Sequence, residues 1–129
     1  MSPPGLRASV YPALLYHAGM ASSFEHTFAL ETYMLAVQQL VGTGEIKGRL
    51  EMAYRTILPL PASQMPEHLR EKHETLKQAL TWVPIEEPGE PSVVSTLRAM
   101  AGDEADRLAK NFFEIYLDLD SAYHTAHGF

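Results

Sequence analysis

Apolar residues recur every three or four positions through the last third of the chain, which is the spacing of a helix that buries one face. Seven residues follow this spacing: Ala105, Leu108, Ala109, Phe112, Tyr116, Leu119 and Tyr123. Asp103 is of a type preferred at helix N-caps, and the acidic first turn after it suits the positive end of the helix dipole. The pattern therefore predicts a long helix from Asp103 to Tyr123 whose stripe packs in the core.

Three further apolar residues of this helix, Phe113, Ile115 and Leu117, fall away from the stripe. A helix with apolar residues on more than one side is either central in its domain or covered by a partner. We therefore take Phe113, Ile115 and Leu117 as interface candidates. We expect a homodimer to which this helix contributes, with help from the apolar N-terminal arm.

Earlier segments are also predicted to be helical. The first is capped by Ser23, extends to Val41 and is apolar over most of its circumference, so it should be central. Gly42 would end it in the left-handed conformation that glycine tolerates. The second begins near Gly44 and stops before Pro59, because a proline inside a helix loses a hydrogen bond and clashes with the preceding turn.

Two shorter helices lie on either side of a stretch rich in proline and glutamate. The first of the two has Pro66 in its opening turn and ends near Trp82, and the second runs from Ser92 to Gly102. Residues 83–91 between them contain three prolines and three glutamates. This composition favours extended backbone, so we expect one extended connection there.

These elements predict an all-α fold, an irregular bundle of four to five helices. A chain of 129 residues can bury enough surface for one core without staples. We therefore expect a single helical domain over residues 1–129, with residues 1–22 as an N-terminal arm or short helix.

Composition narrows the possible chemistry. The chain contains no cysteine, which excludes disulfides, thiolate metal sites and cysteine nucleophiles. We expect a small soluble protein in the cytoplasm. No apolar run approaches the roughly 20 residues that span a bilayer, so we expect no membrane partner.

The negative charge is concentrated near the end of the chain. The formal net charge is −6, and residues 86–129 hold nine carboxylates against Arg98, Arg107 and Lys110. This distribution repels phosphate backbones, so we expect no nucleic-acid partner. It favours a basic protein partner, or it is simply a solvated face that keeps the chain in solution.

Histidines are the only candidate metal ligands with suggestive spacing. His68 with Glu71, and His124 with His127, stand three residues apart on predicted helices, so each pair could reach one ion. The Glu-x-x-His repeat of carboxylate-bridged di-iron bundles does not occur in the chain. We regard these four residues as exposed polar side chains, and we expect no metal and no cofactor.

Catalytic chemistry has little support in the sequence. His17 and His26 lie among aromatic neighbours, where a pocket could shift their pKa values, but a packed and hydrogen-bonded histidine explains the same pattern. No Gly-x-Ser-x-Gly nucleophile motif is present. We expect a non-catalytic interaction or regulatory module. The alternative is a helical bundle that binds a metal or small ligand through histidines and carboxylates, including an enzyme of that kind.

Overall fold

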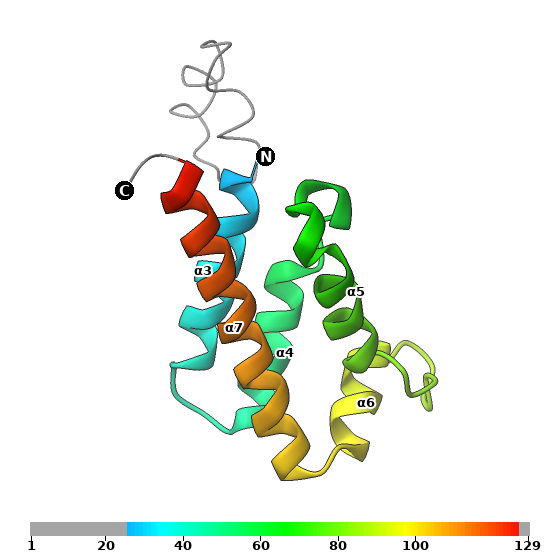
Figure 1. The fold of residues 1–129 in the computed structure, drawn as a ribbon. Coiled ribbons are helices and arrows are strands. Elements are labelled where there is room, and N and C mark those ends of the chain that lie inside the picture. The colour runs from blue at the N-terminus through cyan, green and yellow to red at the C-terminus, as the bar shows by residue number, and fades with distance from the viewer. Residues whose placement is uncertain (1–25, 127–129) are drawn as a thin grey trace.

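The computed structural model describes residues 26–126, which form a bundle of five α-helices with two short 3-10 turns (Figure 1). The helices are α3 (Thr27–Leu40), α4 (Ile46–Ile57), α5 (Arg70–Ala79), α6 (Ser92–Ala99) and α7 (Gly102–Ala126), and the 3-10 turns are η2 (Ala62–Gln64) and η3 (Glu67–Leu69). No strand occurs within this range, and the predicted all-α bundle is confirmed. The arm expected over residues 1–22 lies outside the described residues.

Three helices build the centre of the bundle. α3 and α4 form an antiparallel hairpin, and α7 packs along both of them (Figure 1). α5 lies on the other side of α7 from α3, and α6 crosses below α5 and contacts α4. As a result α3 begins and α7 ends at the same end of the bundle.

The core stripe of α7 differs slightly from the predicted one. It consists of residues that are at most 3 % exposed: Ala105, Leu108, Phe112, Ile115 and Leu119. Their alternating spacing of three and four keeps them on one line of the helix. Four of the predicted stripe residues are therefore confirmed, whereas Ala109, Tyr116 and Tyr123 lie at its half-buried edges.

α3 packs against both other central helices but leaves one of its sides exposed. One face is buried against α4 and α7, and it consists of Ala29, Thr32, Tyr33, Ala36 and Leu40. The other side exposes large apolar side chains, namely Phe28, Met34, Leu35 and Val41. α3 is therefore one of the three central helices, as predicted, but α4 and α7 cover only one of its sides. The helix begins at Thr27, and the proposed cap Ser23 lies outside the described residues.

The turn between α3 and α4 reverses at Gly44 instead of Gly42. Gly44 has a φ of 102°, whereas the N–H of Gly42 still donates to the carbonyl of Gln39 at 3.2 Å and closes the last turn of α3. The guanidinium of Arg49 then donates to the carbonyls of Leu40 and Gly44. These bonds satisfy a free carbonyl at the end of α3 and fix the angle between the two helices.

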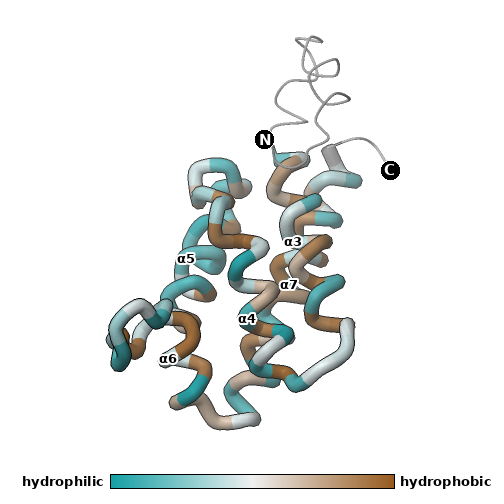
Figure 2. The backbone as a smooth tube through the Cα atoms, turned by 180° about the vertical axis from the view of Figure 1, so that it is seen from behind, coloured by the Kyte–Doolittle hydropathy of each residue, from teal (hydrophilic) through white to brown (hydrophobic). Residues whose placement is uncertain are grey.

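Hydropathy along the backbone matches this arrangement. In Figure 2 the tube of α6 is mainly brown, while that of α5 is mainly teal with isolated apolar positions. α5 buries only His73 and Leu76 within its own bounds. Residues 81–91 carry no helix between α5 and α6. The connection expected there is a closed loop and not an extended span, because Oγ of Ser92 donates to the carbonyl of Val83 at 2.8 Å and the backbone turns at Gly89.

Candidate functional site

The two histidine pairs do not form a ligand set in the described residues. His68 and Glu71 are both exposed, on η3 and in the first turn of α5. Nε2 of His124 lies 3.2 Å from Oδ1 of Asp120, and His127 lies outside the described residues. Within residues 26–126 no three histidine, aspartate or glutamate side chains converge as metal ligands. The expected absence of a metal stays a prediction.

His26 has a structural position at the start of α3. Its side chain is half-buried, and Nδ1 lies 3.1 Å from the carbonyl oxygen of Gln64. The contact joins the beginning of α3 to η2, which is separated from it by 38 residues. The contact agrees with a packed and hydrogen-bonded role for His26. His17 lies outside the described residues.

A buried histidine that the sequence analysis did not select is His73 of α5. The hydroxyl of Tyr33 donates to Nδ1 of His73 at 2.6 Å, and Nε2 of His73 donates to the carbonyl oxygen of Leu60 at 2.8 Å. A carbonyl only accepts, so Nε2 carries a proton, and burial favours the neutral ring in which Nδ1 accepts from Tyr33. Tyr33 and His73 are both fully buried. This network ties α3, α5 and the segment after α4 together.

Burial sets the electrostatics of this pair. It lowers the pKa of the His73 imidazole, because the charged form would lose its hydration. Burial likewise raises the pKa of the Tyr33 hydroxyl far above its ordinary value. Both ring nitrogens of His73 are already bonded and neither side chain is exposed, so the pair is arranged for packing and not for reaction with a substrate.

The spacing of α5 could have revealed His73. Leu69, His73, Leu76 and Leu80 follow one another at intervals of four, three and four, and all are buried. A histidine in such a series is expected to be buried and bonded, but its partner Tyr33, 40 residues away, is not visible from the pattern.

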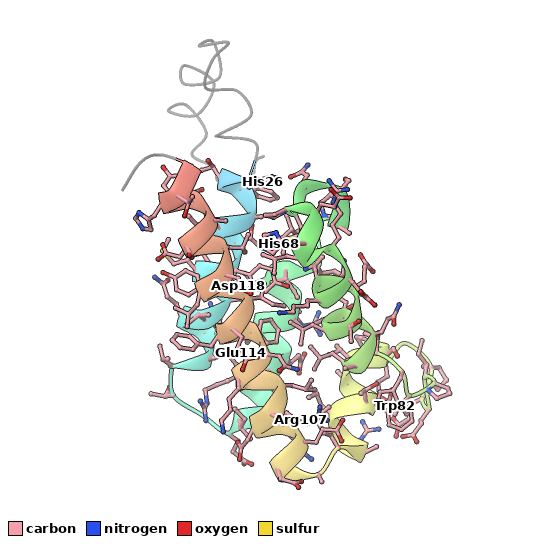
Figure 3. All side chains as sticks on the ribbon, in the orientation of Figure 1. His26, His68, Trp82, Arg107, Glu114 and Asp118 are labelled. Atoms are coloured by element: carbon pink, nitrogen blue, oxygen red, sulfur yellow. The ribbon has the colours of Figure 1, made fainter. Side chains whose placement is uncertain are left out.

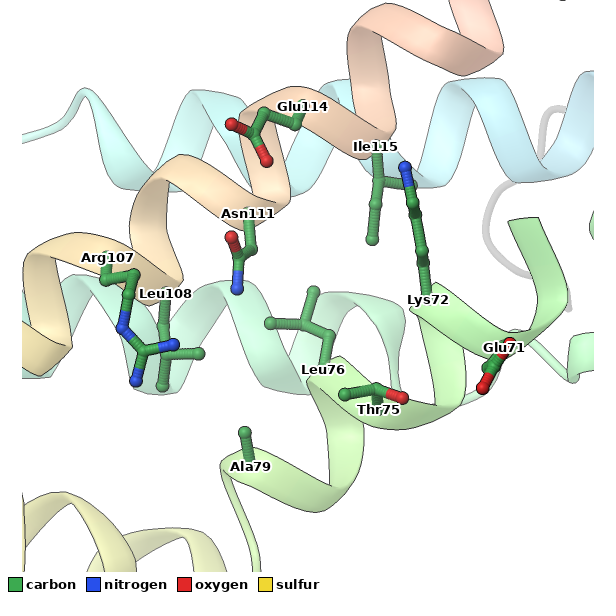
Figure 4. A pocket seen from close by; sticks show the side chains of 10 residues that line it. All are labelled: Glu71, Lys72, Thr75, Leu76, Ala79, Arg107, Leu108, Asn111, Glu114 and Ile115. Carbon is green, nitrogen blue, oxygen red and sulfur yellow. The ribbon is translucent and has the colours of Figure 1, made fainter. Parts of the chain in front are cut away.

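A cleft lies between α5 and α7 (Figure 4). Its volume is about 320 Å³, and Leu76, Leu108 and Ile115 form its apolar floor. Two cations and two anions line its rim, namely Lys72, Arg107, Glu71 and Glu114. The size suits a small ligand, but the balanced rim selects no charge.

The outer face of α7 holds two of the three interface candidates. The side chains of Phe113 and Leu117 are 48 % and 47 % exposed, and the ring of Phe113 lies 6.4 Å from that of Tyr116. Ile115 is 3 % exposed and belongs to the core. Its selection as an interface residue was wrong, because Ile115 continues the stripe three residues after Phe112 and is covered by α5.

α3 extends this exposed face. Tyr33 of α3 and Phe112 of α7 pack with ring centroids 6.2 Å apart, so this part of α3, which Met34 follows, lies against α7. Met34 is 38 % exposed. We call Met34, Phe113 and Leu117 the α3–α7 apolar face. Its three members are exposed apolar side chains of two helices that pack against each other.

Comparisons with known proteins add no relatives. No protein family, curated protein or solved structure matches the chain. Between residues 26 and 126 no helix combines the length and the apolar character needed to cross a membrane.

Proposed function

We propose that the protein is a small non-catalytic interaction module that forms a homodimer through the α3–α7 apolar face. The observation that carries this proposal is the half exposure of Phe113 and Leu117 on one side of α7. Both are large apolar residues, and neither is needed to fill the core.

Burial of these side chains would favour association. Removing a large apolar side chain from water contributes about 1.5–3 kcal/mol when burial is complete. In a two-fold dimer the same face of both subunits forms the contact, so both copies of Met34, Phe113 and Leu117 are buried.

Several earlier expectations belong to this proposal. The apolar arm over residues 1–22 is expected to add to the contact, and a regulatory role in the cytoplasm suits a chain without cysteine. Binding of a metal or small ligand is the alternative function. The α5–α7 cleft supports a small ligand more than a metal, because its floor is apolar.

Light scattering tests the dimer directly. The full chain is expected to have a dimeric mass at micromolar concentration, and the double variant Phe113→Glu with Leu117→Glu is expected to be monomeric. Placing four carboxylates in one two-fold contact would expose them to mutual repulsion and desolvation. Circular dichroism should show unchanged helix content, because both sites are exposed.

Leu58→Glu is the matched control. Leu58 is 48 % exposed but follows α4, away from the proposed contact, so this variant should remain dimeric. A monomeric mass of the unmodified chain at high concentration would remove the dimer. A dimer that survives the double variant would place the contact on another surface.

A further inference from the structure

The connection between α5 and α6 exposes two large apolar side chains. Trp82 is the only tryptophan of the chain and is 65 % exposed, and Ile85 is 60 % exposed. Trp82 lies at the base of the loop that projects beside α6 (Figures 1 and 3). Tryptophan is usually well buried in a folded domain, so its exposure on a projecting loop needs a reason.

The residue after Trp82, Val83, anchors the loop to the body. Val83 is 7 % exposed, and its N–H donates to Oγ1 of Thr96 at 3.0 Å. Its carbonyl accepts from Oγ of Ser92 at 2.8 Å and from Oγ of Ser95 at 3.3 Å. Thr96 and Ser95 are themselves almost completely buried. These bonds hold the backbone of Val83 against α6, so the neighbouring Trp82 has a fixed position relative to that helix.

Arg98 closes the other side of the loop. Its guanidinium donates to Oε1 of Glu86 at 3.0 Å and to Oε2 of Glu90 at 3.1 Å. The hydrogen bond from Arg98 lowers the pKa of Glu90 below its ordinary value. Gly89, with a φ of 82°, forms the turn in which the N–H of Glu90 donates to the carbonyl of Glu87 at 3.0 Å. Hydrogen bonds therefore hold the loop to α6 at Val83, and ion pairs with Arg98 hold it at Glu86 and Glu90.

A loop that hydrogen bonds and ion pairs hold in place, and that exposes apolar side chains, is suited to bind a partner protein. It loses little conformational entropy on binding, because its backbone is already held in place. Tryptophan is among the residues that contribute most to binding when they enter a pocket. The carboxylates of Glu86 and Glu87 are exposed beside these apolar residues, and three glutamates against one arginine make the loop acidic.

We propose that the loop formed by residues 82–91 inserts Trp82 and Ile85 into an apolar pocket with a basic rim on a protein partner. The acidic rim of the loop complements lysine and arginine around such a pocket. It also disfavours anionic membrane surfaces, which attract basic segments. This surface is separate from the α3–α7 apolar face, so the protein can dimerise and bind the partner independently.

Photocrosslinking identifies what the loop touches. The photoreactive amino acid p-benzoylphenylalanine is incorporated at position 82 of the full chain, and, as the matched control, at position 58, where Leu58 is also exposed. Both proteins are irradiated in native lysate, and the cross-linked peptides are mapped by mass spectrometry. We expect an adduct specific to position 82, on an apolar surface that lysine or arginine residues surround.

The recombinant partner then gives the quantitative test. Trp82→Ala and Ile85→Ala are each expected to weaken its affinity at least about tenfold. Glu87→Lys should weaken it further as ionic strength is lowered, since a cation then faces the basic rim. Arg98→Gln, which releases the loop without altering Trp82, should weaken binding by a smaller factor. Leu58→Ala should leave the affinity unchanged.

Other outcomes would overturn the proposal. An adduct to a second copy of the chain, or to an acidic surface, would do so, as would the absence of any adduct specific to position 82. An affinity unaffected by Trp82→Ala would have the same meaning. Because Trp82 is the only tryptophan, its fluorescence gives an independent check: emission should shift to shorter wavelength on adding the partner, and should not shift when the protein alone is concentrated.

Discussion

His73 has a neutral ring whose two nitrogens are both occupied, and this fixes how the fold responds to acid. Tyr33 faces it from α3, the carbonyl of Leu60 faces it from the segment after α4, and Lys77 and Glu74 of its own helix act on it from a distance. Burial, the largest effect, lowers the pKa of His73 in the folded protein.

We predict that this histidine makes the free energy of unfolding fall in mild acid. The unfolded chain binds a proton at His73 below its ordinary pKa of about 6.5, while the folded chain does not until the pH is lower. The contribution is therefore fully present above pH about 6.5 and is lost progressively as the pH falls below it. Urea unfolding of the full chain at a series of pH values measures this loss.

His73→Gln is the control for that measurement. Glutamine does not titrate, so the variant is expected to be less stable at neutral pH but to lose less stability between neutral and mildly acidic pH. An equal loss in both proteins would assign the acid sensitivity to other groups, the carboxylates among them.

A second prediction at the residue scale concerns metal binding. Titration of the full chain with zinc should show only weak binding, because His68 and Glu71 are exposed without further ligands among the described residues and His124 lies beside Asp120. Calorimetry measures the affinity. Submicromolar binding that His68→Ala or His124→Ala abolishes would promote the metal-binding alternative.

At the scale of single helices, α7 offers the sharpest contrast between a buried and an exposed side chain. Phe112 is fully buried, so Phe112→Ala should lower the free energy of unfolding by about 3–5 kcal/mol. Asp118 forms only an exposed ion pair with Lys72, with Nζ and Oδ2 3.7 Å apart, so Asp118→Ala should cost less than about 1 kcal/mol. Equal urea midpoints would show that the buried face has been misidentified.

α7 also shows how far an apolar pattern predicts a helix. Its existence and most of its core stripe followed from spacing alone, and the exposure of Phe113 and Leu117 agrees with their place off the stripe. The burial of Ile115 did not follow from the spacing, because the side of a helix that is buried depends on the helices that pack against it. Because α5 covers the side of α7 that carries Ile115, the buried stripe includes Ile115, and Tyr116 lies at the edge of the stripe.

Contacts between distant segments could not be predicted in this way. Nothing in the local pattern shows that Tyr33 bonds to His73, or that Val83 is held by Thr96. Such pairs depend on which helix faces pack together, and a single sequence does not show which faces are in contact. The same reason explains why Trp82 was assigned to the end of a helix instead of to an exposed loop.

At the scale of the whole molecule, dimerisation should couple stability to concentration. If only the folded chain associates, mass action raises the thermal midpoint as the protein is concentrated. We predict this rise for the full chain, measured by circular dichroism over a hundredfold range of concentration. The Phe113→Glu, Leu117→Glu double variant should have a constant midpoint, and a constant midpoint in both proteins would argue against the dimer.

The chain enters the bundle at the start of α3 and leaves it at the end of α7, and both points lie at the same end of the bundle (Figure 1). The order of the helices along the chain is therefore not imposed by their packing. A short peptide could join the two ends, and new ends could be opened in the exposed turn around Gly44. The fold is suited to circular permutation, which would bring α4 to the front of the chain while leaving every helix contact in place.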